Sequence, residues 1–254
     1  MNRLELETRK HGGQMRTLYK NFIIFCGVVV LKIHPFGVGA LAGNNDVNEF
    51  NPIALYGSKI DFDVIRNGEN IGVHSVRFSS DAEGLLVHCL VEMKINFLAI
   101  FNYRYRYESK SVWNGPEFKM LEATVNDDGK ISSMLATRSG PDIHIRIQDN
   151  SYKTRGPIIP TDHWNANVRL QTRVLNTLTG NVNNVALVDK GSQKVSTEDG
   201  SISATRYSYT GDLVDTDVWY DNAGRWVKLR FLGSDGTPIE YVCRRCRGGQ
   251  QEAQ

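Results

Sequence analysis

The sequence lacks the short motifs that mark the common catalytic sites. Its 254 residues contain no G-x-S-x-G or S-x-x-K nucleophile motif and no phosphate-binding glycine loop. The segment Gly37 to Ala42 matches G-x-G-x-x-A, but it follows no predicted strand, so it does not indicate a dinucleotide site. We therefore assign no catalytic residue and expect no cofactor; the sequence leaves enzymatic activity open but favours a non-enzymatic protein.

Metal-ligand patterns are missing as well. No two of the histidines that follow residue 42 are separated by two or four positions. These histidines are His74, His88, His144 and His163. A C-x-x-C pair, Cys243 and Cys246, follows the last predicted strand, but a zinc site would need a second ligand pair at matched spacing. We expect no metal site.

The charge balance gives no reason to expect nucleic-acid binding. The whole chain has 30 Lys and Arg and 28 Asp and Glu residues. Residues 1–42 hold six of the basic and two of the acidic residues, so the remainder has 24 basic and 26 acidic side chains and a net charge of −2. A near-neutral chain gives no electrostatic argument for nucleic-acid binding, and we expect no nucleic-acid partner.

An apolar run near the N-terminus is too short to span a bilayer but fits the core of a signal peptide. Phe22 to Leu31 contains ten apolar residues, with basic residues before it and the A-x-A pattern Ala40-Leu41-Ala42 after it. We predict that residues 1–42 are an upstream extension and a cleaved signal peptide, the latter within 15–42. The mature protein would then be periplasmic and not an integral membrane protein. A short uncleaved anchor is the alternative.

Strand-like alternation dominates the rest of the sequence, most clearly between Arg206 and Cys243. This stretch is predicted to form four strands and three turns. In the third strand Val227, Leu229 and Phe231 fall on one face, whereas Trp226 falls on the other. Such a pattern is typical of an antiparallel β-meander with one solvated face.

The same alternation begins at Ser58 and is interrupted once. Turn signals such as Asn67-Gly68 separate the apolar runs. Between Thr154 and Asn167 glycine and proline residues produce an irregular insert, because proline cannot occupy a central strand. The following segment, Asn167 to Leu178, fits either a short helix or a strand.

These features predict one all-β domain over residues 58–246. We expect a single antiparallel, strongly curled sheet, a half-barrel or open barrel, of about ten strands with at most one short helix. The insert is predicted to lie across the mouth of the curl. Residues 43–57 are expected to form a mobile leader and residues 247–254 a disordered tail.

Several stretches resemble a known family. The C-terminal ones are Gly211-Asp212-Leu213, Val218-Trp219-Tyr220-Asp221 and Gly224-Arg225-Trp226-Val227-x-Leu229-x-Phe231. Upstream are Tyr103-Arg104-Tyr105-Arg106-Tyr107 and Thr161-Asp162-His163-Trp164-Asn165. Together they are similar to a family of uncharacterised exported proteobacterial proteins, a domain of unknown function, to which no activity is attached. The fold pattern remotely resembles the half-barrels of Lol-type lipoprotein carriers, an analogy of fold only.

Large aromatic side chains are the candidates for a binding site. Three tyrosines share one strand face by period two, and the insert contributes a His-Trp pair. The predicted ligand-lining residues are Tyr103, Tyr105, Tyr107, Trp113, His163, Trp164 and Trp219. The alternative is that these rings form the ordinary core and that the His-Trp pair packs a loop onto the sheet.

Three cysteines remain after residue 42, and an oxidising compartment favours disulfides. We predict that Cys89 pairs with Cys243 or Cys246 and leaves one thiol free.

Three functions follow from these features. The leading hypothesis is a periplasmic protein that binds or carries an apolar or lipidic ligand in the concavity of its sheet. The second is a structural or assembly factor that docks another envelope protein through a sheet edge. The third is a hydrolase centred on His163.

Overall fold

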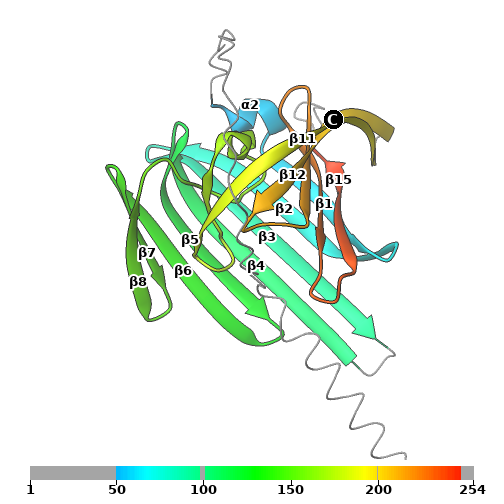
Figure 1. Cartoon of the computed structure of the whole chain (residues 1–254), viewed down its shortest axis with the longest axis horizontal. Helices are drawn as coiled ribbons and strands as arrows, with labels where there is room; N and C mark the ends of the chain where they lie inside the picture. Colours follow the sequence, from blue (N-terminus) through cyan, green and yellow to red (C-terminus); the bar gives the residue numbers. More distant parts are fainter. Residues whose placement is uncertain (1–49, 98–100, 199, 247–254) are drawn as a thin grey trace, which may run out of the picture.

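The computed structural model describes residues 50–97, 101–198 and 200–246, which form a single sheet of 15 strands (Figure 1). The predicted signal peptide, residues 43–49 of the leader and the predicted tail lie outside the described residues. The strands of the N-terminal part are β1 (Lys59–Arg66), β2 (Glu69–Asp81), β3 (Gly84–Phe97), β4 (Phe101–Asn114), β5 (Glu117–Asp127), β6 (Lys130–Ser139), β7 (Asp142–Ile147) and β8 (Asn150–Arg155). The others are β9 (Ile159–Pro160), β10 (Arg173–Leu175), β11 (Val182–Thr197), β12 (Gly200–Gly211), β13 (Thr216–Asp221), β14 (Trp226–Leu232) and β15 (Pro238–Arg245).

The sheet consists of two meanders joined side by side. Its strand order is β8-β7-β6-β5-β4-β3-β2-β1-β15-β14-β13-β12-β11-β10-β9, so β1 pairs with β15 at the junction. Neighbouring strands in the described chain are antiparallel except β9 and β10, which are parallel. Asn67 and Gly68 join β1 to β2 with φ values of 52° and 80°, as the sequence predicted for a tight hairpin. The all-β single sheet is confirmed.

The number of strands, 15, exceeds the predicted number of about ten. The extra strands carry no alternating apolar pattern. Strand β8 is polar and exposed along most of its length, whereas β9 and β10 contain two and three residues. Because a period of two cannot be read from two or three residues, only pairing with neighbours defines such strands.

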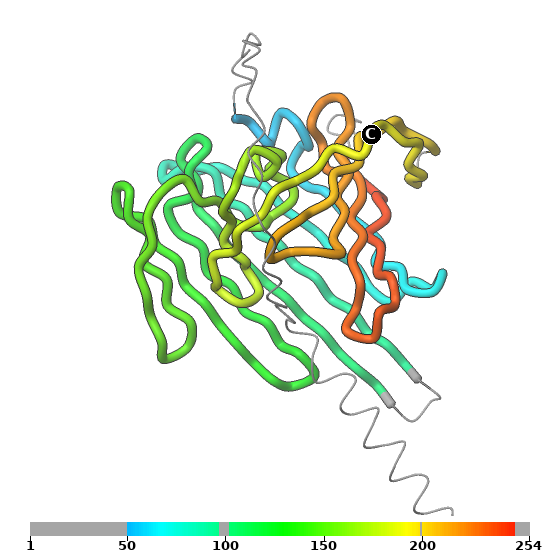
Figure 2. Tube along the Cα trace, in the orientation of Figure 1, coloured from blue at the N-terminus to red at the C-terminus, as the bar shows by residue number. Residues whose placement is uncertain are grey.

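The sheet curls strongly, so that concave side chains from distant strands meet. His74 of β2 and Tyr241 of β15 are separated by β1, which would place them about 10 Å apart in a flat sheet. Their ring centroids lie 5.1 Å apart, and those of Phe62 (β1) and Trp226 (β14) lie 4.2 Å apart. Figure 2 shows the C-terminal meander folded back over the broad N-terminal one.

The insert between β8 and β11 packs into the concave face. It contains β9, a 3₁₀ helix η1 (Ala166–Leu170) and β10, so the ambiguous segment forms both a helical turn and a short strand. Trp164 anchors the insert, because its ring contacts Trp113 and Phe78 at centroid distances of 5.1 and 5.4 Å. The insert therefore supplies the cover that a curled sheet lacks.

A short helix, α2 (Pro52–Tyr56), packs at one end of the curl within the segment predicted to be a mobile leader. Tyr56 is 2% exposed. Its hydroxyl donates to the Trp164 carbonyl and accepts from the Trp226 amide, both at 2.9 Å. The folded unit therefore begins before residue 58 and includes this helix.

The opposite, convex face of the C-terminal meander is covered by the β11–β12 hairpin. The Trp219 indole donates to Gln193 Oε1 of β11 at 3.1 Å, and Glu198 N donates to the Cys243 carbonyl at 3.1 Å. Trp219 pairs across strands with Arg206 and Lys228, and cross-strand partners share a face. The prediction that Trp219 lies on the concave side is wrong. The β11–β12 hairpin covers the convex face here, so a large apolar ring can be buried on that face as well.

The two ends of the sheet meet without strand pairing. Arg173 of β10 donates to the Arg155 carbonyl at 3.0 Å and to Thr154 Oγ1 at 2.9 Å. Tyr152 of β8 donates to the Gly180 carbonyl. Side chains thus hold β8 against the insert. Within the described residues no helix has both the length and the apolar character needed to cross a membrane.

Candidate functional site

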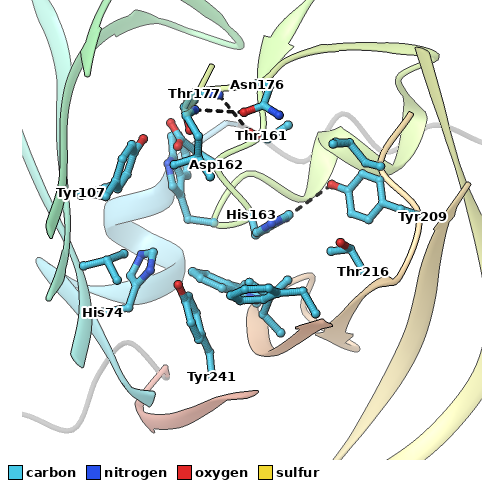
Figure 3. Close-up of a pocket in the computed structure, with 18 of the residues that line it drawn as sticks. His74, Tyr107, Thr161, Asp162, His163, Asn176, Thr177, Tyr209, Thr216 and Tyr241 are labelled. Atoms are coloured by element: carbon cyan, nitrogen blue, oxygen red, sulfur yellow. Dashed lines mark hydrogen bonds between the residues drawn. The ribbon is translucent and has the colours of Figure 1, made fainter. Parts of the chain in front are cut away.

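A cavity of about 260 Å³ lies inside the curl (Figure 3). One wall comes from β2, β3 and β4, the opposite wall from β14 and β15, and the insert closes the space between them. Apolar side chains supply most of the surface, among them Val76, Val91, Met93, Leu229 and Phe231. A mostly apolar concavity with a few polar groups is the usual form of a small-molecule site.

The opening of this cavity is apolar and exposed. Leu178, Val214 and Leu232 line it and are 42%, 58% and 38% exposed. Together with the exposed carboxylate of Asp215 they form the rim. The apolar lining is therefore continuous from the interior to the surface.

His74 is a polar side chain on an otherwise apolar wall. Neither of its ring nitrogens has a hydrogen-bond partner within the described chain, and both atoms are buried. Its ring contacts those of Tyr241 and Trp226; the His74 and Trp226 rings are nearly perpendicular, with a centroid distance of 5.2 Å. Burial, reinforced by the nearby imidazole of His163, lowers the pKa of His74 to about 3. His74 is therefore neutral at pH 7.

Asp162 is the buried acid of the cavity. It is 7% exposed, and its Oδ2 atom has no hydrogen-bond partner among the described residues. The backbone around it is fixed, because Thr161 N donates to the Leu175 carbonyl and Asn165 N to the Asp162 carbonyl. Burial raises the pKa of Asp162 to about 7. Figure 3 shows Asp162 beside Tyr107 on the wall of the cavity.

His163 is held by a hydrogen bond from Tyr220 and lies beside Tyr209. Its Nδ1 lies 3.4 Å from the Tyr209 hydroxyl, and its carbonyl accepts a hydrogen bond from the Tyr220 hydroxyl at 2.9 Å. Burial lowers the pKa of His163 to about 4, so this imidazole is also neutral at pH 7. Its ring lies 5.5 Å from that of Trp226.

Four of the seven predicted lining residues surround the cavity. Tyr105, Tyr107, His163 and Trp164 contribute to its wall. Tyr103 lies on the same strand face, but its hydroxyl donates to Asp127 Oδ1 at 2.6 Å, away from the cavity. Trp113 is fully buried against Phe118 and Trp164. Trp219 lies on the convex side.

Sequence analysis missed His74, Asp162 and Trp226. His74 has the same parity as Val76 and Phe78 on β2, and a polar residue on an apolar face was a usable signal. Trp226 was predicted on the face opposite Leu229, but it lines the cavity with Leu229. An irregularity in the pairing of β13 with β14 gives Val227 no partner, so the alternation shifts by one residue at that point.

The described part of the chain contains a disulfide and one free thiol, as predicted, but the predicted pairing is wrong. Cys243 bonds to Cys246, three residues further along, and Cys89 is a buried free thiol. Cys89 lies on β3, and β1 and β2 separate it from β15. Three strand spacings amount to about 14 Å, whereas bridged cysteines have Cα atoms within about 7 Å. No group of three or more His, Cys, Asp or Glu side chains within the described ranges could hold a metal ion.

Comparisons with known proteins agree with the fold. A crystal structure described as a beta-barrel-like protein of domain of unknown function DUF1849 from Brucella abortus has a TM-score of 0.54 to this chain at 10% sequence identity. The match covers 74% of this chain and 95% of that one, and at this identity it shows similarity of fold alone. No curated protein matches the sequence. A family model matches residues 62–244, and the chain therefore belongs to the family described as a domain of unknown function, DUF6134.

Proposed function

We propose that this protein binds a small, largely apolar molecule in the cavity inside its curled sheet and carries it in the periplasm. The observation that supports the proposal best is the apolar cavity of about 260 Å³, whose lining continues to the surface through an exposed apolar rim. An exposed apolar rim costs solvation free energy, so it favours an entrance that meets an apolar partner molecule. The periplasmic location rests on the signal-peptide pattern of residues 15–42.

The size of the cavity limits the ligand. A dry apolar cavity of about 150 Å³ accommodates one benzene molecule. By proportion, the present cavity of about 260 Å³ holds about ten non-hydrogen atoms. A longer chain would have to extend past the rim.

Calorimetric titration with 1-octanol tests the proposal, using protein purified from the cell envelope fraction after expression of the full chain. Val91→Phe adds volume inside the cavity and is expected to weaken octanol binding about tenfold. Val188→Phe is the matched control, because Val188 is 41% exposed on β11 and does not line the cavity. The control should leave affinity unchanged. Equal effects of the two variants, or no binding of octanol, would refute the proposal.

Docking of an envelope protein through a sheet edge has weaker support. Strand addition requires a row of free backbone groups. At the β8 edge, the Arg155 carbonyl already accepts a hydrogen bond from Arg173. At the other edge, β9 is two residues long and includes Pro160, which has no N–H group. Both edges therefore offer few backbone groups to an added strand.

A hydrolase centred on His163 also has weaker support. A catalytic histidine activates a nucleophile within hydrogen-bond reach. The atom closest to this role is the Tyr209 hydroxyl, 3.4 Å from His163 Nδ1. That distance exceeds the normal range for such a bond.

A further inference from the structure

The charged side chains that line the cavity are all of one sign. Asp162 lies in the interior and Asp215 at the rim, and no lysine or arginine is among the lining residues of the described chain. Two basic groups of the C-terminal meander pair with acids outside the cavity: Arg206 with Asp217 at 2.7 Å and Lys228 with Glu240 at 3.0 Å. A ligand therefore meets negative or neutral groups only.

Asp162 lacks the partner that a buried carboxyl normally has. Its side chain is 7% exposed, lines the cavity, and leaves Oδ2 without a hydrogen bond in the described structure. Buried charges in proteins are paired or coordinated, because an isolated one is strongly destabilised. A positively charged donor group in the cavity would complete this site.

The surroundings of Asp162 suit a cation in a second way. Tyr107 and His74 belong to the wall formed by β2, β3 and β4, and Figure 3 shows Tyr241 of β15 across from Tyr107. Trp226 of β14 and Trp164 of the insert also line the cavity. The faces of aromatic rings attract cations, and the attraction grows where water is excluded. His74 is neutral and therefore does not oppose a positive charge.

On the basis of the proposed function, we infer that the ligand is an organic cation, an amphipathic amine whose ammonium group lies against Asp162 and whose apolar part fills the rest of the cavity. An alkyl carboxylate of the same size would face the Asp162 carboxylate with no compensating base. The ligand class therefore follows from the sign of the buried charge, whereas the cavity alone fixes only the size and the apolar character.

Three probes of equal chain length test this inference by calorimetry at about pH 8, where a primary alkylamine is protonated. They are n-octylamine, 1-octanol and octanoate. We expect octylamine to bind at least about tenfold more tightly than octanol, and octanoate to bind most weakly. Octanol that binds as tightly as octylamine, or octanoate that binds best, would overturn the inference but leave the proposed function standing. No binding of any probe would refute both.

The variant Asp162→Asn tests whether the preference for octylamine over octanol depends on the Asp162 carboxylate. This variant should lose the tenfold advantage of octylamine and keep its affinity for octanol within about twofold. Asp149→Asn is the matched control, because Asp149 is exposed in the turn between β7 and β8 and does not line the cavity; this variant should leave octylamine affinity unchanged. An unchanged amine preference in Asp162→Asn would overturn the assignment.

The wild-type protein provides a test that needs no variant. Octylamine binding should weaken relative to octanol binding as the pH falls from about 8 to about 6, because Asp162 becomes protonated. The other titratable groups that face Asp162 are the Cys89 thiol of β3 and the Tyr107 phenol of β4, and burial raises the pKa of both. They stay protonated in this range, and a pH-independent ratio of the two affinities would contradict the inference.

Discussion

Replacing Asp162 by asparagine is expected to stabilise the unliganded protein, and the gain should grow as the pH rises from about 4 to about 7. Burial raises the pKa of this carboxyl from 3.8 to about 7 in the folded state. The folded state therefore binds the proton more tightly than the unfolded state. Stability is then lost as the pH rises from the unfolded to the folded pKa.

The magnitude follows from the size of the shift. One pKa unit corresponds to about 1.4 kcal/mol, so ionised Asp162 in the empty cavity lowers the free energy of unfolding by on the order of 4 kcal/mol. Because real interiors relax and admit water, this is an upper value. Asparagine has nearly the same shape and no charge, so the variant avoids the penalty at every pH.

The assay is urea denaturation of wild type, Asp162→Asn and the rim variant Asp215→Asn at about pH 5 and about pH 8. We expect Asp162→Asn to exceed wild type by up to about 4 kcal/mol at the higher pH and by up to about 2 kcal/mol at the lower one. The histidines facing the cavity, His74 and His163, have pKa values of about 3 and about 4 and remain neutral throughout. A gain that is equal at both pH values, or a loss at pH 8, would refute the reasoning.

Two further predictions concern the convex face and the cysteines. Trp219→Ala should lower the free energy of unfolding, measured by equilibrium denaturation, by about 3–5 kcal/mol, because Trp219 is 5% exposed. It should leave octanol affinity, measured by calorimetry, unchanged because the ring lies on the side of the sheet opposite the cavity. Reduced octanol affinity would contradict this placement of Trp219. In the exported protein, thiol counting after denaturation should find one free thiol, and peptide mapping should place it at Cys89 and the disulfide at Cys243–Cys246. Labelling of Cys89 without denaturant should be slow because it is 2% exposed, and a Cys89-containing disulfide in the map would overturn the pairing.

The sequence determined what depends on neighbours along the chain. Alternation placed Ile60, Phe62 and Val64 on one face of β1, and all three are fully buried. Asparagine and glycine at 67–68 specified a turn that needs positive φ at both positions. The all-β class and the single sheet follow from such local preferences, since each strand and hairpin is specified by a few consecutive residues.

Only the tertiary structure decided which strand face lines the cavity and which face packs against other parts of the chain. The irregular pairing of β13 with β14 places Trp226 on the cavity wall. The β11–β12 hairpin buries Trp219 on the convex side of the sheet. The cavity joins His74, Asp162 and Trp226, which come from β2, the insert and β14. Their meeting depends on how far the sheet curls, which is a sum over many strands and leaves no periodic signal in any one of them. Likewise, three strand spacings exclude a bridge from Cys89 to the C-terminal pair, a distance that sequence separation does not encode.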